Sequence, residues 1–462
     1  MLFNSYQFIF LFLPTTLIGF FLLNKFSSAK YSTAWLVLMS LIFYGYWDYN
    51  YVALLIFSIL TNFFTGRQIF HSSARKKTWL VVGIIFNLSL LFYFKYTGFF
   101  LSNINAAFGQ NFFVPEIILP LGISFFTFTQ TAFLVDTYRG EVTEYSFGNY
   151  CLFVTIFPHL LAGPILYHKD MIPQFEQIKN SHFNEKIFSE GLAFFIAGLF
   201  KKVVIADNLS PFSNLAFANT DALTCPDAWL GSVIYTIQLY FDFSGYSEMA
   251  IGLGKMMNFN LPQNFDSPYQ ATSIIDFWRR WHMTLSQFVK SYIYIPLGGN
   301  RHGQFSKMKN LFLSMLIIGL WHGANWTYII WGGVHGVLLV INHTWRKLNF
   351  ELPNFLGWLM TFTCVSSALV IFRSENIFEA WNFLSIMYQF QTLELNIFKD
   401  AGAEMYFVLA VSCALAFFSK SVPDLIKNFQ PKLKYAFALS VALISSLLLM
   451  FEQISEFLYF QF

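Results

Sequence analysis

The chain has 462 residues, of which 11% are charged and 56% hydrophobic, with a mean hydropathy of +0.51 and a net charge of +3. This composition excludes a disordered chain and argues against a soluble multidomain enzyme, because both need many more charged residues. It predicts an all-α polytopic membrane protein, and the small net charge gives no indication of a nucleic-acid partner.

The first uncharged run covers residues 6–24, and Lys25 and Lys30 follow it. No basic segment precedes the run, and it has no small-x-small cleavage site. We therefore expect a permanent first span rather than a signal peptide. The positive-inside rule places the N-terminus of such a span on the extracytoplasmic side.

Eleven further uncharged runs follow along the chain. They cover residues 34–47, 51–65, 79–94, 117–135, 147–168, 191–200, 228–241, 311–342, 353–372, 405–419 and 435–451. Several are shorter than the roughly 20 residues that a full crossing needs. We expect roughly 11 crossings together with one or two re-entrant or short interfacial helices, in a single domain that covers residues 1–462.

Basic clusters predict the cytoplasmic loops. They contain Arg67, Arg75, Lys76 and Lys77; Arg279, Arg280, Lys290, Arg301, Lys307 and Lys309; and Lys420, Lys427, Lys432 and Lys434. The segment 373–404 holds two basic and five acidic residues, which suits the outer side. The run 311–342 would then begin and end inside. It is too long for one crossing and too short for two, so we expect a broken pair, with Gly323, Gly332 and Gly333 as candidate break points.

The first polar cluster lies at residues 276–286, where apolar residues recur at helical spacing from Trp278 onwards. Asp276 is one turn from Arg279 and Arg280 and can pair with either. An interfacial helix with tryptophan anchors would explain the Trp and Arg residues of this segment. It would explain His282 poorly, so His282 is a candidate site residue.

The second polar cluster centres on His322, in the longest uncharged run. A buried ionisable residue in a membrane is a functional candidate, although a lone buried histidine is more often a satisfied core residue. Trp321, Asn325 and Trp326 flank it and can supply a hydrogen-bond partner and an apolar wall. His335 would lie about 220° round one continuous helix. Unless the helix breaks, we expect it on another face, with a structural or pocket-lining role.

Other chemistries find little support. The chain has no HExxH, no CxxC and no Walker A sequence, so we predict no metal site, disulfide framework or bound cofactor. A proton-coupled transporter remains an alternative, with Asp242, Glu248 and Asp276 as relay carboxylates. We interpret Asp242 and Tyr246 as neighbours of the site, with Asp242 as a brace that needs a Lys or Arg partner from the basic loop around residues 279–290.

Eight short motifs follow one another along the chain. They are residues 1–14 (MLFNSYQFIFLFLP), 92–96 (FYFKY), 119–127 (LPLGISFFT), 157–164 (FPHLLAGP), 198–202 (GLFKK), 240–246 (YFDFSGY), 277–282 (FWRRWH) and 321–325 (WHGAN). Each alone is weak. In this order they resemble the membrane-bound O-acyltransferase (MBOAT) superfamily, in the bacterial branch typified by alginate O-acetyltransferases.

The resemblance implies an MBOAT fold, in which helices surround a funnel or tunnel, with the core motifs at about residues 119–345. The superfamily's nearly invariant histidine matches His322, and its second site matches His282. The branch passes acetyl groups towards polysaccharides outside the cell. This implies a bacterial inner-membrane location and an extracytoplasmic SGNH-type partner. A sister branch passes D-alanine towards teichoic acid, which is the alternative within the enzyme class.

The chemistry of the residues agrees with acyl transfer. A thioester that reacts with a hydroxyl needs a base for the hydroxyl proton and a site from which water is excluded. An imidazole suits this task near neutral pH, so we predict His322 as general base, with His282 orienting the acceptor or the donor carbonyl. A donor such as acetyl-CoA is anionic and cytoplasmic. We expect Trp278, Arg279, Arg280 and Lys290 to border its entrance.

Overall fold

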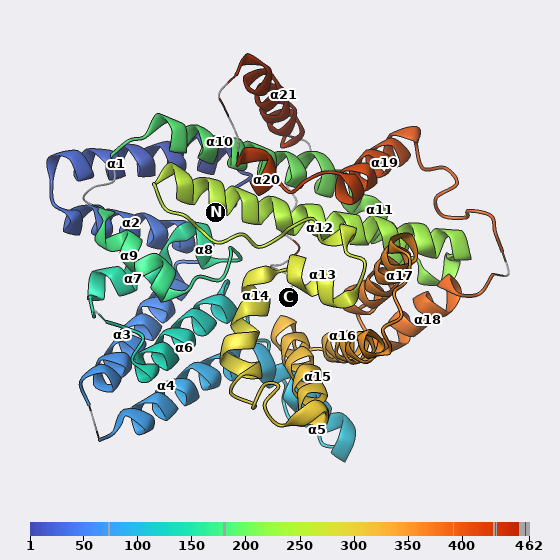
Figure 1. Cartoon of the computed structure of the whole chain (residues 1–462), viewed down its shortest axis with the longest axis horizontal. Coiled ribbons are helices and arrows are strands. Elements are labelled where there is room, and N and C mark those ends of the chain that lie inside the picture. The colour runs from blue at the N-terminus through green and yellow to red at the C-terminus, as the bar shows by residue number, and fades with distance from the viewer. Residues whose placement is uncertain are drawn as a thin grey trace. The chain divides into compact units, whose positions relative to one another are not determined.

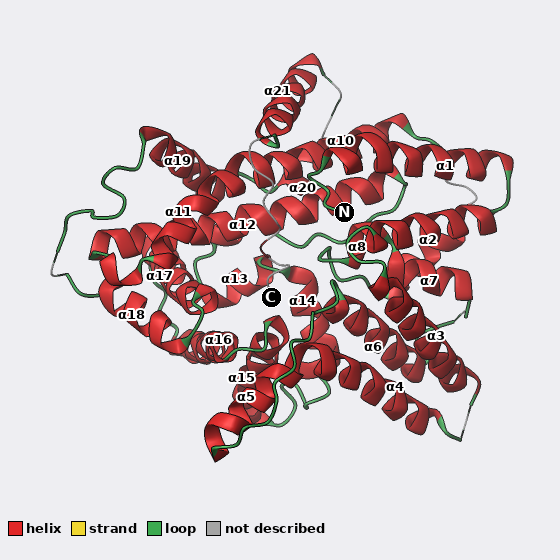
Figure 2. Cartoon of the chain, turned by 180° about the vertical axis from the view of Figure 1, so that it is seen from behind, coloured by secondary structure: helices red, strands yellow, loops and turns green. Residues whose placement is uncertain are grey.

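The computed structural model describes residues 1–72, 74–143, 145–178, 182–390, 392–427, 430, 432–451 and 458. These residues form helices joined by loops and contain no strand, which confirms the all-α prediction (Figures 1 and 2). The chain divides into two compact units, residues 1–195 with 246–262, and residues 196–245 with 263–462. Two of the boundaries fall inside helices α10 (Glu185–Phe200) and α12 (Cys225–Met256), and the third, between residues 262 and 263, lies in the loop after α12. The single-domain organisation stays a prediction.

The first unit is built on an aromatic core. Its helices before α10 are η1 (Phe8–Phe12), α1 (Leu13–Phe26), α2 (Ala29–Gly45), α3 (Asn50–His71), α4 (Lys76–Leu91), η2 (Phe92–Tyr96), α5 (Thr97–Phe108), α6 (Ile123–Arg139), α7 (Phe147–Thr155), α8 (Phe157–Leu160) and α9 (His168–Glu176). Phe12 lies edge-on to Phe157, with ring centroids 5.3 Å apart, and Phe8 and Phe43 pack against both. Buried aromatic clusters of this kind join η1, α2 and α8.

The second unit carries most of the polar clusters predicted above. Apart from the parts of α10 and α12 that belong to it, its helices are η4 (Lys201–Ala206), α11 (Asp207–Ala218), η5 (Thr220–Ala222), η6 (Pro268–Gln270), α13 (Ile274–Arg280), α14 (Met283–Val289), η7 (Lys290–Tyr294), α15 (Gly303–His322), α16 (Trp326–Trp345), η8 (Arg346–Leu348), α17 (Asn354–Arg373), α18 (Ile377–Met387), α19 (Ala403–Phe418), α20 (Val422–Ile426) and α21 (Leu433–Leu449). Helices α15 and α16 lie side by side (Figure 1).

Among the described residues, four helical segments are long and apolar enough to cross a membrane. They are Phe8–Phe26, Asn50–His71, Lys76–Phe108 and Asn354–Arg373. Shorter apolar helices are α18, α19 and α21. The multi-pass membrane character that the composition predicts is therefore present, whereas the expected number of crossings stays a prediction.

Glycines bring α15 and α16 into close contact. A Cβ atom on Gly319 would overlap the backbone carbonyl of Tyr328, and one on Gly332 would overlap the carbonyl of Met315. Small residues permit this backbone approach in membrane helices. The chain breaks between the helices at Gly323, one of the three candidate break points, while Gly332 and Gly333 lie within α16. Gly323 has an ordinary extended backbone (φ −165°), so it is needed for space, because a Cβ there would overlap the Tyr328 ring.

Candidate active site

Three histidines of the second unit line one small cavity. Its walls are Leu239, Phe243, Phe277, Trp281, His282, His322, Trp331, His335, Val365, Leu369 and Phe372, from α12 to α17. The cavity measures about 20 Å³, which is room for about one water molecule. Three of the lining residues are histidines and two are tryptophans, and the other lining side chains are hydrocarbon.

His322 is the last residue of α15 and is buried. Its ring lies edge-on to Trp331 and Phe372, each with centroids 5.3 Å away, and to Trp321 at 5.0 Å. Trp321, Trp331 and Phe372 therefore form the aromatic wall, of which sequence reasoning named only Trp321 as flanking His322.

Trp326 and Asn325 have other roles than the sequence suggested. Trp326 is 47% exposed, so it does not belong to the wall around His322. The Asn325 side-chain oxygen caps α16 by accepting the Thr327 N–H (3.1 Å), and its nitrogen donates to the Glu375 carbonyl (2.8 Å). A capping asparagine at this position stabilises the start of α16 directly after the break.

His282 stands at a sharp turn between α13 and α14. Its backbone is left-handed (φ 45°, ψ 53°), a conformation that is rare for residues other than glycine and in which histidine is enriched. Strained backbone of this kind is concentrated at functional sites. The turn separates His282 from the helix of Trp278, so the continuous amphipathic helix expected from the spacing is two helices of seven residues each.

Asn264 orients His282. Its side-chain Oδ1 accepts hydrogen bonds from His282 Nδ1 (3.1 Å), the Thr284 backbone N–H (3.3 Å) and the Thr284 hydroxyl (2.9 Å). A backbone N–H can only donate, so the shared Asn264 atom is the oxygen and His282 Nδ1 carries a proton. His282 lies outside the helices that can span a membrane, and burial lowers the pKa of its ring to about 3. The ring is therefore neutral at pH 7, with Nε2 as its acceptor nitrogen.

Sequence reasoning missed Asn264. It precedes His282 by 18 residues and lies in no helix. No spacing rule links two such positions. The only local signal is the polar pair Gln263–Asn264 between apolar neighbours, which is common in loops.

His335 shares the cavity with His322. The separation expected for one continuous helix does not occur, because the chain breaks between α15 and α16. Both rings contact Trp331, with centroids 5.3 Å and 4.9 Å away. The indole N–H of Trp278 donates to His335 Nδ1 at 3.3 Å. Trp278 is therefore turned into the protein interior and is not an interfacial anchor.

The two arginines of α13 differ in their surroundings. Arg280 Nε donates to both carboxylate oxygens of Asp276 (3.1 Å each), and Nη1 donates to the Asp266 carbonyl (3.3 Å). Of the two possible partners, Asp276 thus pairs with Arg280. The bond from Arg280 to the Asp266 carbonyl ties α13 to the preceding loop. Arg279 is exposed.

Asp242 is held by a different cation from the one expected. Lys202 Nζ lies 2.7 Å from Asp242 Oδ1 and 2.7 Å from Asp207 Oδ1, and all three side chains are buried. The partner comes from η4 and not from the basic loop of residues 279–290, because the turns of η4 face α12 within the same unit. Asp242 does not line the cavity, although Leu239 and Phe243 of the same helix do.

Tyr246 falls within the first unit. Its ring stacks on Phe3, with centroids 4.7 Å apart and planes 19° from parallel.

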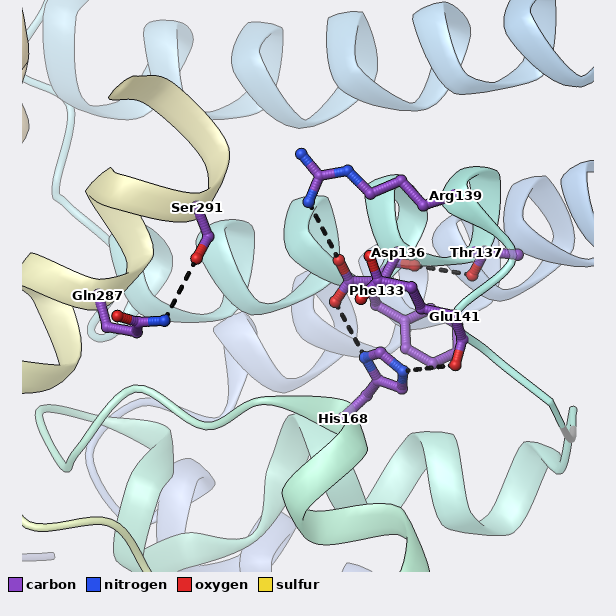
Figure 3. Close-up of polar contacts among 8 residues, drawn as sticks. All are labelled: Phe133, Asp136, Thr137, Arg139, Glu141, His168, Gln287 and Ser291. Atoms are coloured by element: carbon purple, nitrogen blue, oxygen red, sulfur yellow. Dashed lines mark hydrogen bonds and ion pairs between the residues drawn. The ribbon is translucent and has the colours of Figure 1, made fainter. Parts of the chain in front are cut away.

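The first unit also contains a buried polar cluster with Asp136 and His168, which the sequence did not predict (Figure 3). His168 Nδ1 lies 2.9 Å from Asp136 Oδ2, and Nε2 lies 3.4 Å from the Glu141 carbonyl. This pair ties the start of α9 to the end of α6.

The cavity offers nitrogen bases and donors in an apolar enclosure. Within the described residues, no group of three His, Cys, Asp or Glu side chains lies close enough to hold a metal ion. Imidazoles in an apolar site suit proton transfer during attack by a hydroxyl on an acyl group.

Comparison with known proteins agrees with this chemistry. The model of the family described as MBOAT, membrane-bound O-acyltransferase family, matches residues 32–373. A peptidoglycan O-acetyltransferase of Helicobacter pylori is 44% identical over 87% of this chain and 82% of its own length. A probable alginate O-acetylase of Pseudomonas aeruginosa is 42% identical over 90% and 81%. A teichoic acid D-alanyltransferase of Streptococcus thermophilus is 29% identical over 49% and 57%. The chain therefore belongs to the membrane-bound O-acyltransferase family and is an acyltransferase of the membrane.

Proposed function

We propose that the chain moves an acetyl group from a cytoplasmic thioester, acetyl-CoA or a similar donor, to a hydroxyl that leads to O-acetylation of an extracytoplasmic glycan. Two features of the comparisons support acetyl over D-alanyl transfer. The relatives named as O-acetyl enzymes are 40–44% identical and match most of the chain. The D-alanyltransferases are 26–29% identical and match about half.

The observation that carries the proposal is the meeting of His282, His322 and His335 in one enclosed cavity. In the proposed step, the acceptor hydroxyl oxygen bonds to the thioester carbonyl carbon while His322 takes the hydroxyl proton. The carbon–sulfur bond then breaks, and the same proton passes to the departing thiolate. These steps form one ester and one thiol from one thioester and one alcohol, and they return His322 to its starting protonation state.

His282 orients the acceptor in this scheme. Its Nδ1 proton is directed to Asn264, so its Nε2 can accept a hydrogen bond from a hydroxyl but cannot donate one to a carbonyl. Of the two roles predicted for His282, orienting the acceptor is the one that this tautomer supports.

The donor enters beside α13 in this proposal. Arg279 and Lys290 are exposed and can attract the phosphates of the donor, whereas Arg280 is engaged by Asp276. Arg279→Gln should raise the KM for acetyl-CoA and leave kcat and stability unchanged. Arg301→Gln, an exposed arginine outside α13, is the matched control. An unchanged KM in Arg279→Gln would remove this arginine from the donor entrance.

The proposed setting is the bacterial inner membrane. The N-terminus lies outside, and an SGNH-type extracytoplasmic transferase acts as partner. The acetyl group would then leave the cavity on the side opposite to the donor. Co-purification of such a partner from detergent-solubilised membranes would support this arrangement.

The deciding experiment uses inverted membrane vesicles that contain the full chain, so that labelled acetyl-CoA reaches the cytoplasmic face. We expect base-labile label to appear on glycan in the lumen with the wild-type chain. His322→Ala should reduce it about 10²–10⁴-fold while inserting normally. Normal transfer by His322→Ala would refute the mechanism. Label that comes only from a D-alanyl carrier would refute acetyl as the group transferred.

A further inference from the structure

The tautomer of His335 follows from its partner. Trp278 is buried, and its indole N–H donates to His335 Nδ1 at 3.3 Å. An indole nitrogen carries a proton and cannot accept a hydrogen bond. His335 Nδ1 must therefore present its lone pair to Trp278, and the proton of the neutral ring sits on Nε2.

His335 and His282 thus differ in the tautomer of their neutral rings. The Nδ1 proton of His282 is directed to Asn264, so Nε2 is the acceptor nitrogen of that ring. His335 has a donor at Nε2. Within the described residues, the hydrogen bond from Trp278 to Nδ1 is the single hydrogen bond of this side chain. Phe277 stacks on its ring with planes 11° apart, and Trp331 lies edge-on at 4.9 Å. These contacts hold the ring in one orientation.

The cavity has few other donors for an acyl oxygen. Its remaining lining residues are hydrocarbon apart from His322, Trp281 and Trp331. Attack on a thioester places negative charge on the carbonyl oxygen, and a fixed donor in an apolar site stabilises this charge strongly. His322 is needed as the base, so it cannot serve as the donor at the same moment.

We propose that His335, fixed as the Nε2–H tautomer by Trp278, donates the hydrogen bond that stabilises the carbonyl oxygen of the acyl donor during transfer. This assignment rests on the acyl-transfer function proposed above. His335 is then a catalytic residue that acts as a neutral donor, and Trp278 is its positioning residue. The acetyl group keeps its carbon–oxygen double bond at the end of the step, and no proton leaves His335.

The test compares two replacements of His335 in the vesicle assay with acetyl-CoA. Leucine removes the donor, whereas glutamine places an amide N–H near the position of Nε2 but cannot act as a base. We expect His335→Leu to lower kcat about 10²–10³-fold and to change KM for acetyl-CoA little. His335→Gln should recover most of this loss. His322→Gln should stay as inactive as His322→Ala, because a base cannot be replaced by an amide. His343→Gln, on the same helix but outside the cavity, is the matched control.

Trp278 adds a second measurement. Trp278→Phe should lower kcat in the wild-type background and should have little further effect in the His335→Gln background, since its role passes through the imidazole. Equal effects in both backgrounds would mean that Trp278 is only structural and would overturn the positioning role.

A His335→Gln variant as impaired as His335→Leu, with both inserted and eluting as folded protein, would overturn the donor role. Near-normal kcat in His335→Leu would overturn it too. A wild-type chain that transfers nothing from acetyl-CoA would instead overturn the proposed function, and the assignment with it.

Discussion

Three imidazoles in one apolar cavity are useful to an acyltransferase because each is held by a different neighbour. Asn264 accepts a hydrogen bond from His282 Nδ1, Trp278 donates one to His335 Nδ1, and His322 is enclosed by aromatic rings. The side chains that hold the histidines therefore decide which nitrogen is basic and which is a donor. Replacing these neighbours is as informative as replacing the histidines themselves.

Asn264→Ala should both destabilise the second unit and lower transfer. It would remove the acceptor that three buried donors share, and the loss of a buried hydrogen-bond partner costs about 1–3 kcal/mol. The measurement is thermal unfolding in detergent followed by fluorescence-detected size exclusion, alongside the vesicle assay. Thr284→Val removes only the hydroxyl of the group and should have the smaller effect. Equal stability of Asn264→Ala and the wild-type chain would show that this network has no such role.

At the scale of helices, the cavity depends on how closely α15 and α16 approach each other. His322 ends one helix, while Trp331 and His335 belong to the next, so the distance between the helices fixes the distance between the rings. The glycines at the contact leave no space for a methyl group against the opposite backbone. Backbone cannot move aside as a long side chain can, so this contact should tolerate substitution poorly.

Gly332→Ala and Gly333→Ala test this contact with the same substitution at adjacent positions. A Cβ on Gly332 would overlap the Met315 carbonyl, whereas one on Gly333 would lie 3.5 Å from Leu316 Cδ2, an ordinary contact. We expect Gly332→Ala to lower both folded yield and transfer. Gly333→Ala should be neutral or stabilise the helix by roughly 0.5–1 kcal/mol. Indistinguishable melting and activity in the two variants would contradict the close-contact argument.

The Lys202 group offers a second test at this scale. Lys202 of η4 bridges Asp207 of α11 and Asp242 of α12, so Lys202→Met would remove the cation that both buried carboxylates share. Breaking a buried ion pair in this way costs about 3–5 kcal/mol. Lys201→Met, the same change at the adjacent residue, is the control and should cost much less. The comparison is made by thermal unfolding, and similar losses in both variants would exclude a bracing role for the pair.

In the proposed function, the whole molecule separates a cytoplasmic donor from an extracytoplasmic acceptor, and its loop charges predict how it is oriented. Residues 279–309 are rich in Lys and Arg, and residues 373–404 carry more acidic than basic residues. Positive loops stay in the cytoplasm during insertion. The exposed side chains of Phe305 and Gln389 provide places to test the two segments.

Cysteine labelling checks this orientation in a chain whose four native cysteines are replaced. A membrane-impermeant maleimide should label Gln389→Cys in intact cells from which the outer barrier has been removed. It should label Phe305→Cys only after the inner membrane is opened. Labelling of Phe305→Cys in sealed cells would invert the predicted topology and place the donor entrance on the wrong side.

Much of this protein was predictable from its sequence because the responsible forces act locally. Few charges and long apolar runs specify membrane helices, and a histidine in the longest run is conspicuous because burying it is costly. Eight motifs in order were enough to indicate the family that the comparisons then showed. The pairing of Asp276 was narrowed to two arginines by helix spacing alone, since both are within one turn.

Only the tertiary structure decided which residues complete the site. Asn264 holds His282 across 18 residues, Trp278 holds His335 across 57, and the partner of Asp242 is Lys202 and not a residue of the basic loop. Such pairs depend on where a helix breaks and which faces meet. Helical periodicity places His335 away from His322 only if the helix is unbroken, and the sequence offered three candidate break points without deciding which one is used. The break at Gly323 and the contact between glycines on α15 and α16 instead bring both rings against Trp331.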